Sequence, residues 1–349
     1  MKRIGTTLNH GAVDKVRALP GLPHRFVSTE AMIAVLVFVV LAVLPAVLAG
    51  YPIFILPQYM LFGMLALSLG LLWGFVGIVS FGQAAFFALG AYTMGLAMQQ
   101  AAGPVNPAYV GLVLSILLGG ALAGAVGYFL FSAGVRGSYF VIVTLALSII
   151  VEQLAVSQSQ ITGGWNGMFI NRMSLTFGPL GELPLYGDVA IYYVVLAIVA
   201  ATYFLLKWLT ASKFGKVLVG IRENEDRLIS LGFSTSLYET AAFALSGAIA
   251  CLAGAFYGTH ASFVAPSLAG VLFSTEVVVW VAIGGRGSLL GALLGGIFVA
   301  SLSNYLSSII PEYWQLALGV LFVFVIVYLK GGIAGAVERL TTRGNWSRG

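Results

Sequence analysis

Long apolar segments alternate with short polar ones along most of the chain, and this pattern predicts membrane-spanning helices. Two apolar segments, Gly82–Met98 and Phe273–Ile283, are glycine-rich or short, as half-helices and broken spans are. Counting both predicts ten spans and places the two termini on the same side of the membrane. The other eight are each long enough to cross a bilayer as a helix: Ala31–Gly50, Leu56–Trp73, Ala108–Phe131, Tyr139–Ala155, Ala190–Leu206, Glu239–Tyr257, Leu289–Ser308 and Tyr313–Leu329.

Composition places the chain in the class of all-α membrane proteins with many spans. Hydrophobic residues make up 60% of the sequence and charged residues only 8%, and the mean hydropathy is +1.00. A soluble protein with so few charges lacks the polar side chains to cover its surface, whereas lipid-facing helices need apolar side chains. The net charge of +5 comes from scattered basic residues, which argues against a nucleic-acid partner. Cys251 is the single cysteine, so a disulfide within the chain is excluded.

The positions of Lys and Arg predict the orientation, because loops on the cytoplasmic side carry an excess of them. With ten spans and a cytoplasmic N-terminus, sixteen of the seventeen basic residues are cytoplasmic and Arg172 alone is outside. Eight spans would move Arg136 and the cluster after Lys213 to the other side relative to the N-terminus, so ten is preferred. We therefore expect cytoplasmic tails at 1–29 and 331–349, a membrane domain over 30–330, and an external segment over Val156–Asp188.

Ten spans divide into two groups of five with opposite orientations, which allows an inverted repeat. Trp73-x3-Gly77 and Trp280-x3-Gly284 lie in corresponding glycine-interrupted regions, although two such short motifs also arise by chance. A repeat would place a substrate path between the halves, beside broken helices. Three glycine pairs are typical of close helix packing: Gly70-x3-Gly74, Gly120-x3-Gly124 and Gly291-x3-Gly295.

The charged segment Lys213–Thr235 is predicted to be a cytoplasmic loop containing a short amphipathic helix bounded by glycines. Helical spacing places four apolar residues on one side: Val217, Ile221, Leu228 and Leu231. The same spacing predicts ion pairs on the other side, from Arg222 to Glu225 and Asp226 and from Glu223 to Arg227. Two interpretations remain from the pattern alone: a solvated connector, or a docking element for a cytoplasmic partner.

Enzyme chemistry has no support in the sequence. The three histidines, His10, His24 and His260, lack metal-ligand spacing, so we expect neither a metal site nor catalytic residues. The phosphate-binding motif G-x4-G-K-[ST] does not occur. If ATP drives a transport process here, a separate subunit must bind it.

Five motifs in a fixed order between about Leu56 and Gly335 give the chain a family resemblance. They are Gly74–Tyr92, Arg136–Phe140 with Thr144–Ala146, Thr162–Gly167, Arg222–Glu225 and Ile283–Leu289. With these motifs the chain resembles the permease subunits of ABC importers for branched-chain amino acids and urea, and within them the larger, M/C-type group. It departs from the common pattern at Gln83, where many relatives have histidine, so roles proposed for that imidazole do not carry over.

The resemblance implies a multi-pass, pore-forming subunit of the bacterial inner membrane. It further implies a heterodimer with a second permease, two cytoplasmic ABC ATPases that bind ATP and Mg²⁺, and a periplasmic substrate-binding protein, while this chain itself binds no cofactor. The charged loop then resembles the coupling helix that enters a groove on the ATPase. The residues implied in ATPase coupling are Gly215, Lys216, Ile221, Arg222, Glu223, Asn224, Glu225, Asp226 and Gly232.

A translocation path for a zwitterion needs polar groups inside the membrane domain. The candidates are Ser80, Phe81, Gln83, Thr144, Glu152, Thr162, Gly163, Gly164, Asn166 and Glu276. Glu152 and Glu276 are costly in hydrocarbon, so we expect them to face protein or water, or to lie near the external interface.

The substrate and the class of transporter are left with alternatives by the sequence. The motifs around Trp73 and Trp280 are similar to urea permeases, and the loop around Arg222 is equally similar to permeases for branched-chain amino acids. A hydrophobic amino acid is the preferred substrate, and urea or another short amide is the alternative. The rival classes are a stand-alone secondary transporter or channel that uses Glu152 or Glu276 as its ion site, and a membrane scaffold.

Overall fold

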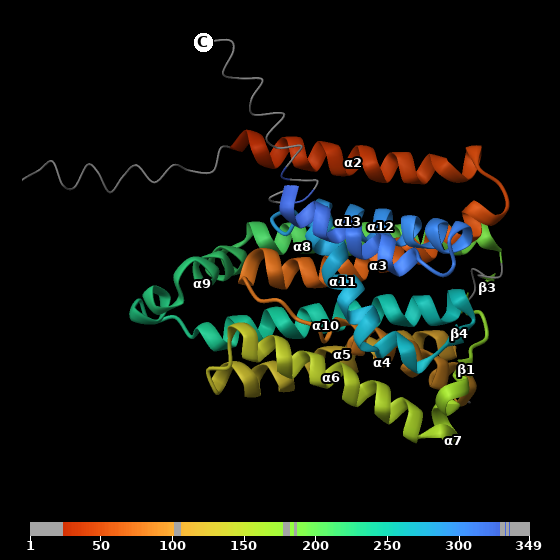
Figure 1. The fold of residues 1–349 in the computed structure, drawn as a ribbon, viewed down its shortest axis with the longest axis horizontal. Helices are drawn as coiled ribbons and strands as arrows, with labels where there is room; N and C mark the ends of the chain where they lie inside the picture. The colour runs from red at the N-terminus through yellow and green to blue at the C-terminus, as the bar shows by residue number, and fades with distance from the viewer. Residues whose placement is uncertain are drawn as a thin grey trace, which may run out of the picture. The chain divides into compact units, whose positions relative to one another are not determined.

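The computed structural model describes residues 24–100, 106–176, 182–184 and 187–328, together with residues 332 and 335, and most of both expected tails lies outside these ranges. Helices form most of the described chain (Figure 1). In chain order the elements are α2 (His24–Val47), α3 (Tyr51–Leu71), the π-helix η2 (Leu72–Val76), α4 (Gln83–Gln100), α5 (Pro107–Ser132), α6 (Gly137–Ser157), α7 (Ser159–Thr162), the 3-10 helix η3 (Gly164–Asn166), β1 (Met168–Phe169), β2 (Ser174–Thr176), β3 (Glu182–Pro184), α8 (Asp188–Ala211), α9 (Lys213–Ser230), α10 (Thr235–Ala261), β4 (Phe263–Val264), the 3-10 helix η5 (Pro266–Ala269), α11 (Val271–Gly284), α12 (Leu289–Ile309) and α13 (Trp314–Tyr328).

Every predicted span coincides with a helix, which confirms the all-helical class. The ten helices concerned are α2, α3, α4, α5, α6, α8, α10, α11, α12 and α13. Within the described residues, six helices are long and apolar enough to cross a membrane by length and composition: Tyr51–Val76, Pro107–Ser132, Gly137–Ser157, Asp188–Ala211, Thr235–Ala261 and Leu289–Ile309. The exact number of spans and the inverted repeat stay predictions. The helix α2 begins at His24, within the residues expected to form the N-terminal tail, and the boundary of the membrane domain stays a prediction.

The contacts within the chain divide it between Leu44 and Pro45, and α2, which crosses this boundary, is described here by itself. In the part that follows, α3 with η2 and α10 form the centre. The most apolar stretch of Tyr51–Val76 is 89% buried, and that of α10 is 67% buried. In α5 and α6 the corresponding stretches are only 28% and 22% buried. All four helices are apolar, so their hydropathy does not distinguish central from peripheral ones. The exposed apolar faces of α5 and α6 are therefore surfaces for lipid or for another membrane protein.

An aromatic cluster joins four helices at the centre. The ring of Phe62 on α3 lies 5.9 Å from Phe87 on α4 and 5.4 Å from Tyr257 on α10, measured between ring centroids. It also lies 5.5 Å from Phe273 and 5.2 Å from Trp280, both on α11. Aromatic pairs at these separations add favourable interactions to the burial of their area. The cluster thus anchors the short helix α11 to the central helices.

Glycines allow the backbones of α4 and α10 to touch. A Cβ atom on Gly90 would overlap the carbonyl group of Cys251, and one on Gly254 would overlap that of Phe87. The approach is reciprocal, because each helix supplies one glycine and one carbonyl. Such contact is typical of small-residue interfaces in membrane proteins.

The three glycine pairs named from the sequence differ in how tightly they pack. A Cβ on Gly70 would come within 2.8 Å of the Cβ of Ala292, and one on Gly295 would overlap the carbonyl of Trp280. Gly120 and Gly124 have room, since a Cβ there would be 3.6 Å and 3.5 Å from its nearest neighbour. Close approach between α5 and α10 is instead made by Gly119.

The end of the molecule opposite α9 carries the short strands (Figure 1). β1 and β4 pair antiparallel, Met168 with Val264 and Phe169 with Phe263, and β2 pairs separately with β3. Nearby, Arg172 lies 3.6 Å from the carboxylate of Asp188 and 5.8 Å from the ring centroid of Phe54.

The contact between α4 and α10 predicts a sharp difference between two glycine substitutions. Gly90→Ala should lower the free energy of unfolding by about 1–3 kcal/mol, because the added methyl group meets backbone that has no rotamer to change. Gly120→Ala is the matched control on α5, where a Cβ has ordinary van der Waals space at 3.6 Å, and it should be neutral. Thermal unfolding in detergent measures both variants. Equal melting temperatures for the two would contradict the close approach.

Candidate functional site

The charged segment forms α9, but it is two short helices joined at Asn224 and not the single helix that the spacing predicts. Asn224 has extended backbone angles, φ −163° and ψ 100°. Its side-chain oxygen accepts a hydrogen bond from the backbone N–H of Arg227 at 3.0 Å. Asn224 therefore caps the second helix in the manner of an N-cap residue, and the acidic Glu225 and Asp226 occupy the first turn, where the helix dipole favours them.

The break corrects the predicted ion pairs of this segment. Arg222 donates to the Oε1 atom of the adjacent Glu223, from Nε at 3.2 Å and from Nη2 at 2.7 Å. Glu225 pairs with Arg136, which is far away in sequence. Helical i+3 and i+4 neighbours no longer face each other once the chain bends between them, so the predicted pairing of Arg222 with Glu225 was wrong.

The apolar side of α9 is only partly available to a partner. In the first half, Leu218 and Ile221 are buried against the chain's own helices, and Gly215 is so close to Thr210 that a Cβ would overlap its carbonyl. Leu231, which follows the second half, is 67% exposed. Lys216 and Asp226 are exposed, and Gly232 ends the segment with a left-handed backbone at φ +85°. The surface free for docking is thus the charged side together with the tip after Asn224.

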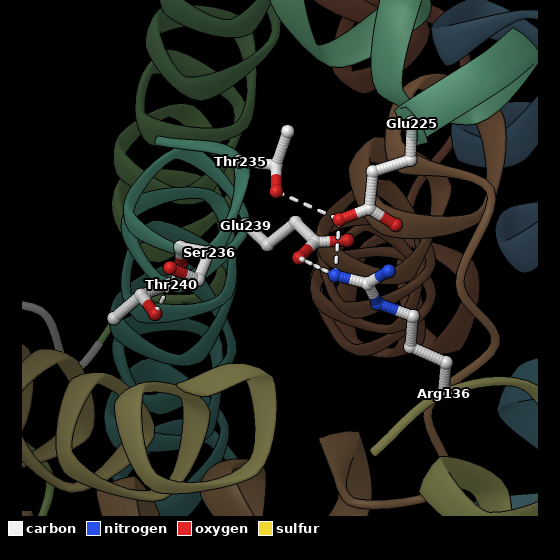
Figure 2. A network of polar contacts seen from close by, with 6 residues as sticks. All are labelled: Arg136, Glu225, Thr235, Ser236, Glu239 and Thr240. Atoms are coloured by element: carbon white, nitrogen blue, oxygen red, sulfur yellow. Dashed lines mark hydrogen bonds and ion pairs between the residues drawn. The ribbon is translucent and has the colours of Figure 1, made fainter. Parts of the chain in front are cut away.

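A polar network fastens the second half of α9 to the membrane helices (Figure 2). Arg136, which directly precedes α6, forms an ion pair with Glu225, and its Nη2 atom lies 3.7 Å from the carboxylate of Glu239 on α10. Thr235, at the start of α10, donates its hydroxyl to Oε1 of Glu225 at 2.7 Å. The side chain of Glu239 is only 2% exposed. Three elements distant in sequence therefore meet around one guanidinium group.

The network is electrostatically unbalanced, because two carboxylates share one arginine. The Nε atom of Arg136 and the Oε2 atom of Glu239 are buried without a hydrogen-bond partner. Sequence reasoning missed Thr235 and Glu239 as site residues. The available signal was a carboxylate at the very start of an apolar segment, at Glu239, which is costly to bury unless paired.

The second feature of the site is the break between α3 and α4. After η2, Gly77 adopts a left-handed conformation, and the chain runs without helix to Gly82. The backbone N–H of Phe81 donates to Oγ1 of Thr144 at 3.1 Å, and its carbonyl accepts from the hydroxyl of Ser148 at 2.8 Å. Both partners lie on α6. Their hydroxyls replace the helical partners that the unwound backbone lacks.

Four of the predicted path residues meet at this break, namely Ser80, Phe81, Gln83 and Thr144. Ser80 accepts a hydrogen bond from the backbone N–H of Gly82 at 3.1 Å. The Oε1 atom of Gln83 accepts from the hydroxyl of Ser68 at 3.1 Å, while its Nε2 atom is buried without a partner. Apart from Phe81, which is half-buried, they are buried. In this conformation they hold the unwound chain in place.

The remaining predicted path residues lie elsewhere. Glu152, on α6, is half-buried beside Gly270, where α11 is about to begin. Glu276, on α11, is half-buried. The motif Thr162–Gly167 contains the last residue of α7 and the 3-10 helix η3; Gly163 and Gly164 have positive φ, and Asn166 is exposed. Within the described ranges, no group of three or more His, Cys, Asp and Glu side chains is arranged to hold a metal ion.

The comparisons with known proteins agree on one family. The profile of the family described as "Branched-chain amino acid transport system / permease component" matches residues 51–326. The chain has no significant match among solved structures.

Curated relatives carry related names. The high-affinity branched-chain amino acid transport system permease protein LivM of Escherichia coli (strain K12) is 29% identical over 301 residues, which is 78% of this chain and 68% of that protein. The probable branched-chain amino acid transport permease protein LivM of Methanocaldococcus jannaschii is 26% identical over 69% of this chain and 77% of its own length. The autoinducer 2 import system permease protein LsrC of Escherichia coli O9:H4 (strain HS) is 25% identical over 52% of this chain and 54% of its own length.

The network around Arg136 predicts an energetic coupling between residues 89 positions apart, 136 and 225. Arg136→Gln should lower the melting temperature, because it leaves the carboxylates of Glu225 and Glu239 side by side. Adding Glu225→Gln should recover part of the loss, with a coupling energy of about 0.5–3 kcal/mol in a double-mutant cycle. Thermal unfolding of the two single variants and the double variant measures it, with Glu223→Gln as the control outside the network. Strictly additive effects would show that the pair contributes nothing to stability.

Proposed function

Because the chain belongs to the family of permease components of branched-chain amino acid transport systems, we propose that it carries branched-chain amino acids across the inner membrane as a subunit of an ATP-driven importer. The observation that carries this function is the family match, which runs from the start of α3 into α13 and includes both α9 and the break before α4. The two LivM relatives named above support the substrate class. The urea alternative finds no support among the relatives reported.

The proposed partners follow from the surfaces that the chain leaves free. The charged side of α9 would dock on one of two cytoplasmic ABC ATPases, which would hold ATP and Mg²⁺, since the sequence lacks a phosphate-binding loop. The apolar faces of α5 and α6 would contact lipid or the second permease subunit. A periplasmic binding protein would deliver the substrate at the end that carries β1 and β4. This chain would bind no cofactor.

Ten spans with both termini in the cytoplasm are the proposed topology of the membrane domain 30–330. Its support is the separation of the cations: Arg136 and Arg222 lie at the end that carries α9, and Arg172 lies at the opposite end beside Phe54 and Asp188. This separation agrees with the positive-inside rule. The segment 213–235 is then cytoplasmic.

The translocation path is proposed to pass the break before α4 and the two half-buried carboxylates, Glu152 and Glu276. The unwound segment supplies backbone polar groups within the membrane domain, as broken helices do at transport sites. The family match argues against the alternative of a stand-alone transporter or channel, because its members are components of larger transport systems.

The topology predicts the outcome of cysteine labelling. Asn166→Cys and Asn224→Cys both place a thiol at an exposed position, one in η3 and one in α9. An impermeant maleimide added to intact cells should label the first, and the second should react only after the membrane is opened. The buried Cys251 provides a low background. Labelling of both positions from outside would contradict the ten-span topology.

Docking on an ATPase predicts sensitivity to charge reversal on the exposed side of α9. Exchanging the charges in the variant Asp226→Arg with Arg227→Asp keeps the net charge but opposes a surface built for the original pattern. ATPase co-purification and uptake of labelled leucine into proteoliposomes that contain the binding protein should both fall. The matched control is the exchange Arg172→Asp with Asp188→Arg at the opposite end, which should leave co-purification intact.

Two results of this experiment would count against the proposal. Unchanged ATPase co-purification in the α9 variant would make α9 a solvated connector. Uptake by the unmodified transporter that urea suppresses and leucine does not would reassign the substrate class.

A further inference from the structure

At the end of α3, the carbonyl group of Gly74 is among those that have no partner in their own helix. In a regular α-helix the backbone N–H of Ile78 would bond to the carbonyl of Gly74, four residues earlier. Here the N–H groups of Gly77 and Ile78 both point to the carbonyl of Leu72, at 2.9 Å and 3.2 Å, because the last turn is wound as a π-helix. Gly74 is buried, and a buried carbonyl without a donor is costly.

Arg222 of α9 supplies the missing donor. Its Nη1 atom donates a hydrogen bond to the carbonyl oxygen of Gly74. The aliphatic part of the side chain lies on Gly77, where a Cβ would be 2.7 Å from the Cγ of Arg222. A cation is also the charge that a helix C-terminus favours. Arg222 of α9 therefore acts as a C-cap for the end of α3, although Gly74 lies 148 residues earlier in the chain.

The unwound segment begins directly after this cap. Gly77 to Gly82 run from the end of η2 to the start of α4 and are fastened to α6 through Phe81, Thr144 and Ser148. Rewinding the last turn as an α-helix would give Gly74 a donor from Ile78 and would remove the extra residue that a π-turn contains. Rewinding would shift the residues after the turn by one position in register, which would displace Phe81 from Thr144. Two arrangements of the same residues thus compete, and Arg222 stabilises one of them.

We propose that Arg222 is a positioning residue that keeps the end of α3 in its π-wound form, and that withdrawal of α9 during transport releases the segment Gly77–Gly82 from α6. The inference rests on the proposed function for the motion of α9, and it gives that motion a defined target inside the membrane domain. It also assigns Arg222 to the chain's own broken helix and not to the surface that meets the ATPase. A two-state element biased by a neighbouring contact is an established type of switch in proteins.

The first test measures how often the segment is released. The Ser80→Cys thiol is placed at a position only 1% exposed, so a small methanethiosulfonate reagent reaches it only after release. In the assembled transporter in membranes, adding Arg222→Gln should raise the labelling rate about tenfold, the factor expected from losing one charge-assisted hydrogen bond. Arg222→Lys keeps a single donor and should give an intermediate rate. Arg172→Gln removes an arginine at the opposite end, away from Gly74 and from the docking side of α9, and should leave the rate unchanged.

The second test locks the segment in place. An ideal Cβ on Gly82 lies 3.5 Å from the Cβ of Thr144, which is within the range for a disulfide. The Gly82→Cys, Thr144→Cys double variant is compared with itself: oxidation should lower its leucine uptake, and a reductant should restore the uptake of the reduced form. ATPase co-purification should stay the same throughout, because α9 is not altered.

The outcomes separate this inference from the proposed function. An equal labelling rate in the Ser80→Cys protein with and without Arg222→Gln would overturn the role of Arg222. Full uptake by the oxidised double variant would overturn the need for release. Absence of ATPase co-purification or of leucine uptake in the unmodified protein would refute the importer, and the labelling rates would still report on the contact between Arg222 and Gly74.

Discussion

The constraint on which this structure depends is that every backbone polar group inside the membrane needs a partner from the protein. Intact helices satisfy it by themselves, and so the chain is mostly helix. Where the chain unwinds between Gly77 and Gly82, hydroxyls of Thr144 and Ser148 from α6 supply partners for Phe81. Just before the unwound segment, a guanidinium from α9 supplies one for the carbonyl of Gly74. The break in one helix therefore fixes the positions of two others.

The sequence predicts the helices well and the contacts between them poorly. Apolar length alone locates all ten helices that were expected to span, including the two uncertain ones that became α4 and α11. The division of α9 at Asn224 was not predicted, because residues 213–230 have helical periodicity on both sides of that position. The decisive contacts, from Arg136 to Glu225 and from Arg222 to Gly74, join residues 89 and 148 positions apart. Spacing rules that relate residues within one helix cannot predict such pairs.

Hydropathy also fails to separate the centre from the periphery. α5 is as apolar as the central helices and yet remains mostly exposed, because a lipid-facing side chain and a buried one have the same character. Small residues are the better guide, since Gly90 and Gly254 mark where two backbones touch. Even this signal is local: the pair named from the sequence on α5 has room, while its neighbour Gly119 is the one in contact with α10.

The backbone contact between α4 and α10 has a mechanical consequence. Two helices that interlock at Gly90 and Gly254, with no side chains between them to change rotamer, shift together as one rigid body. α10 begins at Thr235 and Glu239, which are tied to α9 through Glu225 and Arg136. Any tilt imposed on the end of α10 that carries Thr235 and Glu239 is therefore transmitted along α4 to the opposite end without being absorbed on the way. The places where the chain can bend are then the unwound segment Gly77–Gly82 before α4 and the break in α9 at Asn224.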